Sequence, residues 1–282
     1  MILVLGSTGN VGRELVAQLA AAGESVRAFT RTPEKVPSLP GCVAVGGDLD
    51  DTNTLSAAMD GVDRVFVAVP AGPHSSTQDA NVAKALTGSK VRHVVKLSSL
   101  DVLPPADNLY AGLLAAGERS LRESGVRCTV LRPTAFMTNA FQWLHSVKSQ
   151  RTVYGMYGGI ARALIDPADI AAVAVEMLRS EDGDNEIHAL TGPQPLTLPE
   201  QVAILSSVLG EEISYVDAPP ETVGEAMKQA GMDADFVAGM LTALGNTDPE
   251  RGGVALPTVE RITGRPPTTF ADWLTANVSR FR

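Results

Sequence analysis

The sequence contains few cysteines and histidines and no long hydrophobic run. Its 282 residues include two cysteines, Cys42 and Cys128, and four histidines, none of them at metal-ligand spacing. This scarcity argues against a disulfide framework and a zinc-type site, so we expect two buried, reduced thiols and no bound metal. No segment approaches the ~18 uninterrupted apolar residues of a membrane span. The first apolar run, residues 2–5, is too short for a signal-peptide core, so we expect a cytoplasmic protein.

Positive charge is also scarce. The 23 lysines and arginines against 32 aspartates and glutamates give a net charge of −9 at pH 7. Such an acidic chain does not favour nucleic-acid backbones or anionic membranes as partners. The hydrophobic content of 44% supports a substantial core. The length suits one large α/β domain or a domain with a smaller lobe.

The start of the chain carries an apolar run that leads into three evenly spaced glycines. The run at 2–5 is followed by Gly6-Ser7-Thr8-Gly9-Asn10-Val11-Gly12. Apolar residues then recur at helical spacing until Gly23, which ends the predicted helix. In a parallel sheet, such glycines permit a tight turn, close approach of a pyrophosphate and close helix packing, while the helix N-terminus attracts phosphate. We therefore predict that residues 6–12 bind a nucleotide.

Further apolar, β-branched runs alternate with helical segments. Strands are predicted at 26–29, 42–46, 62–69, 91–98, 128–132 and 186–190. Helices are predicted at 54–59, 76–89, 109–124 and 134–150, and from Asp166-Pro167 and the capping box Thr197–Glu200 onward. This alternation predicts an α/β fold with a doubly wound parallel sheet, the Rossmann arrangement.

We expect two parts. Residues 1–154 form the dinucleotide-binding domain, with the last sheet strand near 186–190. Residues 155–282 form mostly a smaller, helix-rich lobe for the substrate or a partner. Ligands of such sheets bind at the carboxyl ends of the strands, so the lobe is expected there.

Basic residues follow the second predicted strand, where an NAD site usually has a carboxylate. Arg31 and Lys35 could hold the 2′-phosphate of NADP, which a carboxylate would repel. We therefore predict NADP(H) in preference to NAD(H); the alternative is that both are solvated loop charges. Asp48-Leu49 after the third strand would lie beside the adenine, although Asp48 would equally suit a turn cap.

Other strand ends complete the predicted cofactor site. Val69-Pro70-Ala71, after the fourth strand, would approach the ribose or form only a rigid turn. Pro133-Thr134, after the sixth strand, would lie near the nicotinamide.

The order of these motifs resembles the NmrA-like group of atypical short-chain dehydrogenase/reductases. The matching segments are the glycine turn, residues 31–35, Gly47-Asp48-Leu49, Lys96-Leu97-Ser98-Ser99, residues 131–137 and residues 262–270. The resemblance spans almost the whole chain. It implies NADP(H) binding, together with either reduction of quinone- or dye-like acceptors or a non-catalytic redox-sensing role through a protein partner.

The catalytic dyad of standard short-chain reductases is incomplete. Those enzymes use Tyr-x-x-x-Lys, in which the lysine lowers the pKa of the proton-donating tyrosine, and a serine at the end of the fifth strand. Tyr110 stands in the corresponding region, but Leu114 occupies the lysine position. Tyr110 is therefore a catalytic candidate or a helix-packing residue. Ser98 and Ser99 are catalytic candidates that could contact substrate or the nicotinamide ribose, or they are turn formers.

An aromatic cluster follows the sixth strand. Phe136, Met137, Phe141 and Trp143 are candidates to wall a pocket for a flat acceptor, or form core at helical spacing. Lys96 interrupts an apolar strand; we expect it to reach solvent by snorkelling rather than to take part in catalysis.

The incomplete dyad favours acceptors that need no strong acid. A quinone accepts hydride to give a stabilised anion, whereas a simple ketone needs a proton donor. We therefore predict an NADPH-dependent oxidoreductase that reduces a small conjugated acceptor such as a quinone or dye. The alternative is a non-catalytic NADP(H) sensor acting on a protein partner. A nucleotide-sugar epimerase is disfavoured, because that chemistry depends more on the missing proton shuttle.

Overall fold

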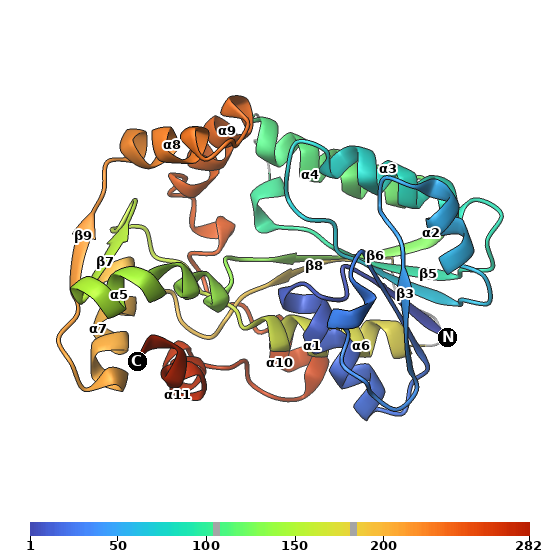
Figure 1. The fold of residues 1–282 in the computed structure, drawn as a ribbon, viewed down its shortest axis with the longest axis horizontal. Coiled ribbons are helices and arrows are strands. Elements are labelled where there is room, and N and C mark those ends of the chain that lie inside the picture. Colours follow the sequence, from blue (N-terminus) through green and yellow to red (C-terminus); the bar gives the residue numbers. More distant parts are fainter. Residues whose placement is uncertain (104–107, 181–184) are drawn as a thin grey trace.

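A seven-stranded, fully parallel sheet forms the centre of the protein. The computed structural model describes residues 1–103, 108–180 and 185–282. The sheet order is β3-β2-β1-β4-β5-β6-β8. Its strands are β1 (Ile2–Leu5), β2 (Val26–Thr30), β3 (Cys42–Gly46), β4 (Arg64–Val67), β5 (His93–Leu97), β6 (Arg127–Pro133) and β8 (Ile187–Leu190). Helices cover both faces (Figure 1), so the predicted doubly wound fold is confirmed.

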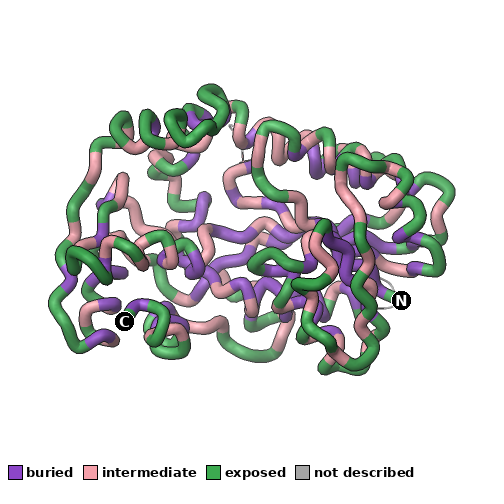
Figure 2. The backbone as a smooth tube through the Cα atoms, in the orientation of Figure 1, coloured by how far each residue is buried: buried purple, intermediate pink, exposed green. Residues whose placement is uncertain are grey.

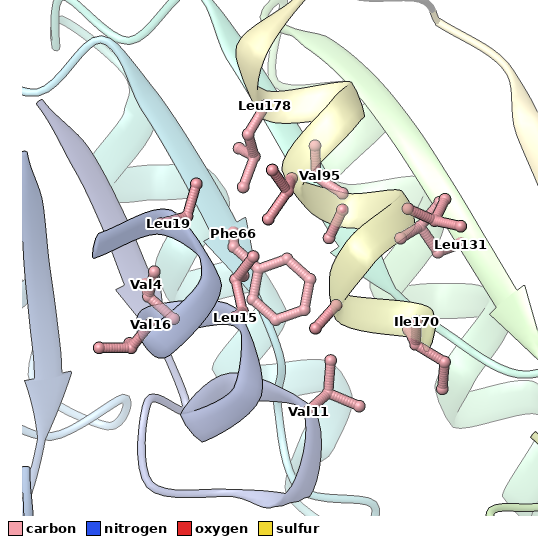
Figure 3. Close-up of a cluster of buried hydrophobic side chains, with 14 of the residues drawn as sticks. Val4, Val11, Leu15, Val16, Leu19, Phe66, Val95, Leu131, Ile170 and Leu178 are labelled. Carbon is pink, nitrogen blue, oxygen red and sulfur yellow. The ribbon is translucent and has the colours of Figure 1, made fainter. Parts of the chain in front are cut away.

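One face of the sheet is covered by helices from both halves of the sequence. These helices are α1 (Asn10–Ala21), α6 (Pro167–Arg179) and α10 (Thr258–Thr263). Leu15 and Leu19 of α1 meet Ile170 and Leu178 of α6 around Phe66, which lies on β4 (Figure 3). The helices present apolar residues every three to four positions, and together these residues form the core on this face of the sheet.

The opposite face is covered by α2 (Thr52–Ala58), α3 (Ser75–Leu86) and α4 (Leu109–Arg122). Because side chains of a strand alternate between faces, Val4 of β1 packs toward α1 while Leu3 and Leu5 pack toward α2 and α3. Burial on both sides explains why the strands appear in the sequence as continuous apolar runs.

The smaller lobe has its own core. It contains α5 (Leu144–Gln150), α7 (Leu198–Leu209) and α11 (Phe270–Phe281), with a parallel pair of strands, β7 (Thr152–Gly155) and β9 (Ser214–Asp217). The helices α8 (Pro220–Gln229) and α9 (Ala234–Leu244) extend from this lobe to α4 (Figure 1). Figure 2 shows buried residues concentrated in the sheet and continuing into the lobe.

Two local predictions were confirmed and one was wrong. Asp166 caps α6, and the Thr197–Glu200 capping box begins α7. The single helix predicted at 134–150 is instead an extended segment, the 3₁₀ helix η3 (Met137–Trp143) and α5. The chain stays extended to Phe136 because Phe136 bridges Ile165 in a parallel pairing.

The sheet includes segments from beyond residue 154. The strand predicted near 186–190 is β8, and α6 also belongs to the sheet layer. The division into 1–154 and 155–282 stays a prediction. Cys128 is buried and Cys42 only half-buried, and neither forms a disulfide. Within the described ranges, no helix combines the length and apolar character needed to cross a membrane.

Candidate active site

The loops after the sheet strands surround one large cleft. Its volume is about 850 Å³, and its walls follow β1, β2, β3, β4, β5 and β6 at their carboxyl ends. This is the position at which doubly wound sheets bind ligands, because the helices on the two faces diverge there. The segments that line it are Gly6 and Thr8–Gly12, Phe29–Arg31, Gly47–Leu49, Ala68–Ser75, Leu97–Asp101 and Pro133–Phe136.

The glycine turn at one end of the cleft leaves no space for side chains. Gly6 has a positive φ of 75°, and a Cβ on it would lie 2.5 Å from the carbonyl oxygen of Ala68. A Cβ on Gly12 would lie 2.1 Å from the carbonyl oxygen of Gly6. Helix α1 begins after Gly9 with no side-chain cap and no acidic residue in its first turn. Its first N–H groups are thus left for an anionic ligand.

The residues of the predicted turn have different roles. Thr8, Asn10 and Val11 line the cleft together with the glycines. Ser7 does not: it is buried, and its hydroxyl donates to the carbonyl oxygen of Phe29 at 2.9 Å. Ser7 therefore ties the turn to β2, and its predicted contact with the cofactor is not supported by its position.

The end of β2 provides the candidate site for the adenosine part of the cofactor. Arg31, Asp48 and Leu49 line the cleft there. Lys35 lies in the 3₁₀ helix η1 (Pro33–Lys35) and is not among the described residues that line the cleft. The carboxylate of Asp48 accepts a hydrogen bond from the N–H of Asp50 at 3.1 Å, so it caps a turn as well as lining the cleft.

The middle of the cleft lies between the loops after β4 and β6. Val69, Pro70 and Ala71 line one side, and Pro133 and Thr134 the other. The hydroxyl of Thr134 is buried and has no hydrogen-bond partner among the residues that the structure describes. A buried polar atom normally has a partner, so this hydroxyl suits a polar group of a bound ligand. Together, this hydroxyl, the uncapped N-terminus of α1 and the glycine turn form a cleft that suits a dinucleotide.

Tyr110 and Leu114 lie one helical turn apart on the wall beyond β5. Burial and the nearby carboxylate of Asp101 raise the pKa of Tyr110 above its ordinary value, against the effect of a hydrogen bond with Ser99. The Ser99 hydroxyl donates to Asp101 at 2.8 Å. The Tyr110 ring also packs edge-on against Phe236 of α9, with centroids 5.6 Å apart. Tyr110 thus lies in the cleft but stays protonated at neutral pH.

Ser98 is held from behind by a buried charged network. Its hydroxyl donates to the carboxylate of Glu118, which also accepts two hydrogen bonds from Arg132, at 2.9 and 2.6 Å. Beside it, Lys96 donates to both oxygens of Asp79, at 2.7 and 3.0 Å. Both Lys96 and Asp79 are only 2% exposed. The prediction that Lys96 reaches solvent is therefore wrong.

The predicted aromatic pocket is only partly formed. Phe136 lines the cleft, but Met137 and Phe141 do not. Both belong to the core of the smaller lobe, where the Phe141 ring lies 5.0 Å from that of Trp273 and under the guanidinium of Arg280. Trp143 packs against the same core. The assignment of Met137, Phe141 and Trp143 to a pocket is corrected, because all three pack in the core of the smaller lobe.

Residues that no sequence pattern indicated complete the far end of the cleft. Asn139, Arg162 and Arg251 line it. Arg162 lies in the connection from β7 to α6, and Arg251 in the 3₁₀ helix η4 (Pro249–Arg251). Isolated arginines in connecting segments have no motif that marks them, so only the tertiary structure brings them to the site.

Comparison with known proteins agrees with this geometry. The chain is 36% identical to the (4-alkanoyl-5-oxo-2,5-dihydrofuran-3-yl)methyl phosphate reductase of Streptomyces griseus, over 100% of this chain and 99% of the relative. It is 32% identical to the NAD(P)H azoreductase of Xenophilus azovorans, over 100% and 99% of the two chains.

A solved structure shares the fold over the whole length. An NADPH-dependent quinone oxidoreductase from Escherichia coli, complexed with NADPH, superposes with a TM-score of 0.85 at 22% identity, covering 99% of this chain and 100% of that one. A family model described as NAD(P)H-binding matches residues 6–181, which include the glycine turn and the other strand-end segments that line the cleft. The chain therefore belongs to the NAD(P)H-binding family.

Proposed function

We propose that this protein is an NADPH-dependent reductase that transfers hydride to a small conjugated acceptor. The observation that carries the proposal is the pairing of Tyr110 with Leu114 on the wall of the cofactor cleft. A standard short-chain reductase has a lysine one turn after the tyrosine, which lowers the tyrosine pKa. Here burial and Asp101 raise it instead. The chain therefore offers no activated phenol at this place.

This arrangement suits acceptors that stabilise the added electron pair themselves. Bound NADPH supplies the hydride. When hydride adds to a quinone, an azo group or an alkene conjugated with a carbonyl, the electron pair of the broken π bond is delocalised. The resulting anion then takes one proton from water, which completes a two-electron reduction. The chain's own part is to position the acceptor along the cleft and limit access of water.

The relatives support this chemical class. One is named for azo reduction. The other is named for an oxo-dihydrofuran that carries an alkanoyl group and a methyl phosphate, a ring whose double bond is conjugated with carbonyl groups. Azo, quinone and enone groups all accept hydride without an alkoxide intermediate. We infer that this chain acts on a member of that class.

We also propose that NADPH is preferred to NADH, because Arg31 stands at the end of β2 on the cleft wall. A guanidinium can bind the 2′-phosphate through two hydrogen bonds. Arg31→Asp should weaken NADPH binding about tenfold or more and leave NADH binding within a few fold, since a charge-assisted contact contributes about 1.5–3 kcal/mol. Fluorescence titration with both cofactors measures the ratio. Arg265→Asp, at an exposed position outside the cleft, is the control; an unchanged ratio in Arg31→Asp would remove this argument.

The test of activity is NADPH oxidation, followed by absorbance, with a panel of quinones and azo dyes. Acceptor-dependent turnover supports the reductase. Tight NADPH binding without turnover of any acceptor would instead favour the non-catalytic sensor, and the search would turn to protein partners.

A further inference from the structure

Two arginines converge at the end of the cleft away from the glycine turn. Both Arg162 and Arg251 line it, and backbone carbonyls hold both side chains in place. Arg162 donates from one terminal nitrogen, Nη2, to the carbonyl oxygens of Leu244 at 3.3 Å and Asn246 at 2.7 Å. Within the described part of the chain, Arg162 forms no ion pair with a carboxylate. These two hydrogen bonds fix the orientation of the guanidinium but do not involve its Nη1 and Nε atoms.

Arg251 is almost fully buried, at 3% exposure. It donates through Nη1 to the carbonyl oxygen of Asp101 at 2.9 Å and through Nη2 to that of Leu103. These bonds fix a second guanidinium behind the same wall. A charge that is buried to this degree is stabilised only by partners held close to it.

Gly252 connects this pair with the centre of the site. A Cβ on Gly252 would lie 2.2 Å from the Thr134 hydroxyl oxygen and 3.9 Å from Cδ of Arg162. The stem of Arg162 is therefore close to Thr134, which follows β6. The α1 N-terminus and Arg31, which we assign to the cofactor phosphates, belong to other strand ends, those of β1 and β2. The arginine pair is thus separate from the groups that we assign to the cofactor phosphates.

Opposite charges act on Arg162 at this end of the cleft. Asp101 lines the cleft together with the two guanidinium groups. Burial is the main cause that lowers the pKa of Arg162, and Arg251 lowers it further, while Asp101 acts in the opposite direction. A bound anion would relieve the repulsion between the two cations. Guanidinium groups bind phosphates and other oxyanions through paired, charge-assisted hydrogen bonds.

Resting on the proposed function, we propose that Arg162, with Arg251 beside it, binds an anionic oxygen group carried by the acceptor, of the phosphate or sulfonate type. The acceptor is then anchored at one end by this charge, while its conjugated part lies against the middle of the cleft near Thr134. Arg162 acts in recognition and positioning; no proton or electron passes through it.

A matched pair of acceptors tests the proposal: naphthoquinone and its sulfonate, with NADPH at saturation. Arg162→Gln should raise KM for the sulfonate about 10–100-fold, the effect of losing a charge-assisted hydrogen bond, and leave KM for naphthoquinone within about twofold. Arg162→Lys should recover part of the loss, because it keeps the charge without the planar fork. Arg265→Gln, exposed and outside the cleft, should change neither value. Equal KM changes for both acceptors, or none, would overturn the proposal.

Binding measurements separate this proposal from the proposed function. Calorimetry with NADP⁺-loaded protein should show naphthoquinone sulfonate binding that Arg162→Gln abolishes, whether or not the protein turns over quinones. Unaltered NADPH affinity in the variant verifies its folding. If the variant does not fold, inorganic phosphate serves as probe for the unaltered protein: it should compete with the sulfonate and not with naphthoquinone. Absence of this competition would contradict the anion site.

Discussion

At the scale of single residues, Tyr110 stands where the family resemblance predicts a proton donor, but its environment does not lower its pKa. Burial and Asp101 raise its pKa, so the phenol stays protonated from pH 6 to 9 and contributes no limb to a pH–rate profile in that range. Tyr110→Phe should therefore keep kcat for quinone reduction within a few fold and leave the profile unchanged. Steady-state kinetics across this range measure both. A loss of about a hundredfold, typical of a general acid, would show that the hydroxyl takes part.

Lys96 and Asp79 give a second residue-scale prediction, on stability. Both are buried, and they are paired at 2.7 Å. Lys96→Met leaves the Asp79 carboxylate buried without its cation, which should lower the free energy of unfolding by about 3–5 kcal/mol. Urea denaturation at pH 7 measures this loss.

The pH dependence of that loss follows from the pKa of Asp79. Burial, the largest cause, already raises this pKa, and Lys96 opposes the rise. Without Lys96 the folded-state pKa rises further above the unfolded value of about 3.9. The folded state then binds the proton more tightly, so the contribution of Asp79 to stability is greatest below pH 4 and is lost as pH rises through the folded pKa. The free energy of unfolding of Lys96→Met should be lower at pH 8 than at pH 5. In Asp79→Asn/Lys96→Met this pH difference should disappear; if it persists, another group causes it.

At the scale of elements, the contact between α3 and α4 depends on one glycine. A Cβ on Gly117 of α4 would lie 2.1 Å from the Oδ2 atom of Asp79 on α3. Gly117→Ala should therefore force the helices apart and destabilise the protein by about 1–3 kcal/mol, the range for overpacking. Gly112 lies in the same helix with open space around it, so Gly112→Ala should be neutral or stabilise by up to about 1 kcal/mol. Thermal unfolding of both variants provides the comparison, and equal shifts would contradict it.

The elements that could be predicted from the sequence are those with a strong local pattern. The buried strands appear as apolar runs, and the glycine turn and the caps at Asp166 and Thr197 have defined residue types. The strands β7 and β9 could not be predicted, because most of their residues are half-buried or exposed and neither segment is a continuous apolar run. The 3₁₀ helix η3 was predicted as α-helix, since the four-residue spacing of Met137 and Phe141 is typical of an α-helix.

The candidate site divides in the same way. The strand-end residues that line the cleft follow from the alternation of strands and helices, as for Pro70 and Thr134. The buried partners of Lys96 and Ser98 could not be predicted, because a charged residue in a sequence does not reveal which distant residue neutralises it. Arg162 and Arg251 likewise reach the cleft only through the path of the smaller lobe.

At the scale of the whole molecule, the two halves of the sequence share one core. Helix α6 and strand β8 come from beyond residue 154, yet both complete the sheet layer. Ile170 and Leu178 of α6 are fully buried against Leu15, Phe66 and their neighbours (Figure 3). Removing α6 would expose one face of a sheet whose strands are apolar on both sides, and such a surface favours aggregation.

This packing leads to a prediction about the boundary at residue 154. A fragment of residues 1–154 lacks α6, α10 and β8, so it should not fold: we expect aggregation, or a circular dichroism spectrum without a cooperative thermal transition, and no NADPH binding. The intact chain should unfold in a single main transition that moves to higher temperature with NADPH, because ligand at a hundred times its Kd adds about 2.7 kcal/mol. A fragment that unfolds cooperatively and binds NADPH would instead establish residues 1–154 as an independent domain. The lost burial argues against that outcome, because each large apolar side chain removed from a core costs about 1.5–3 kcal/mol, and α6 contributes several.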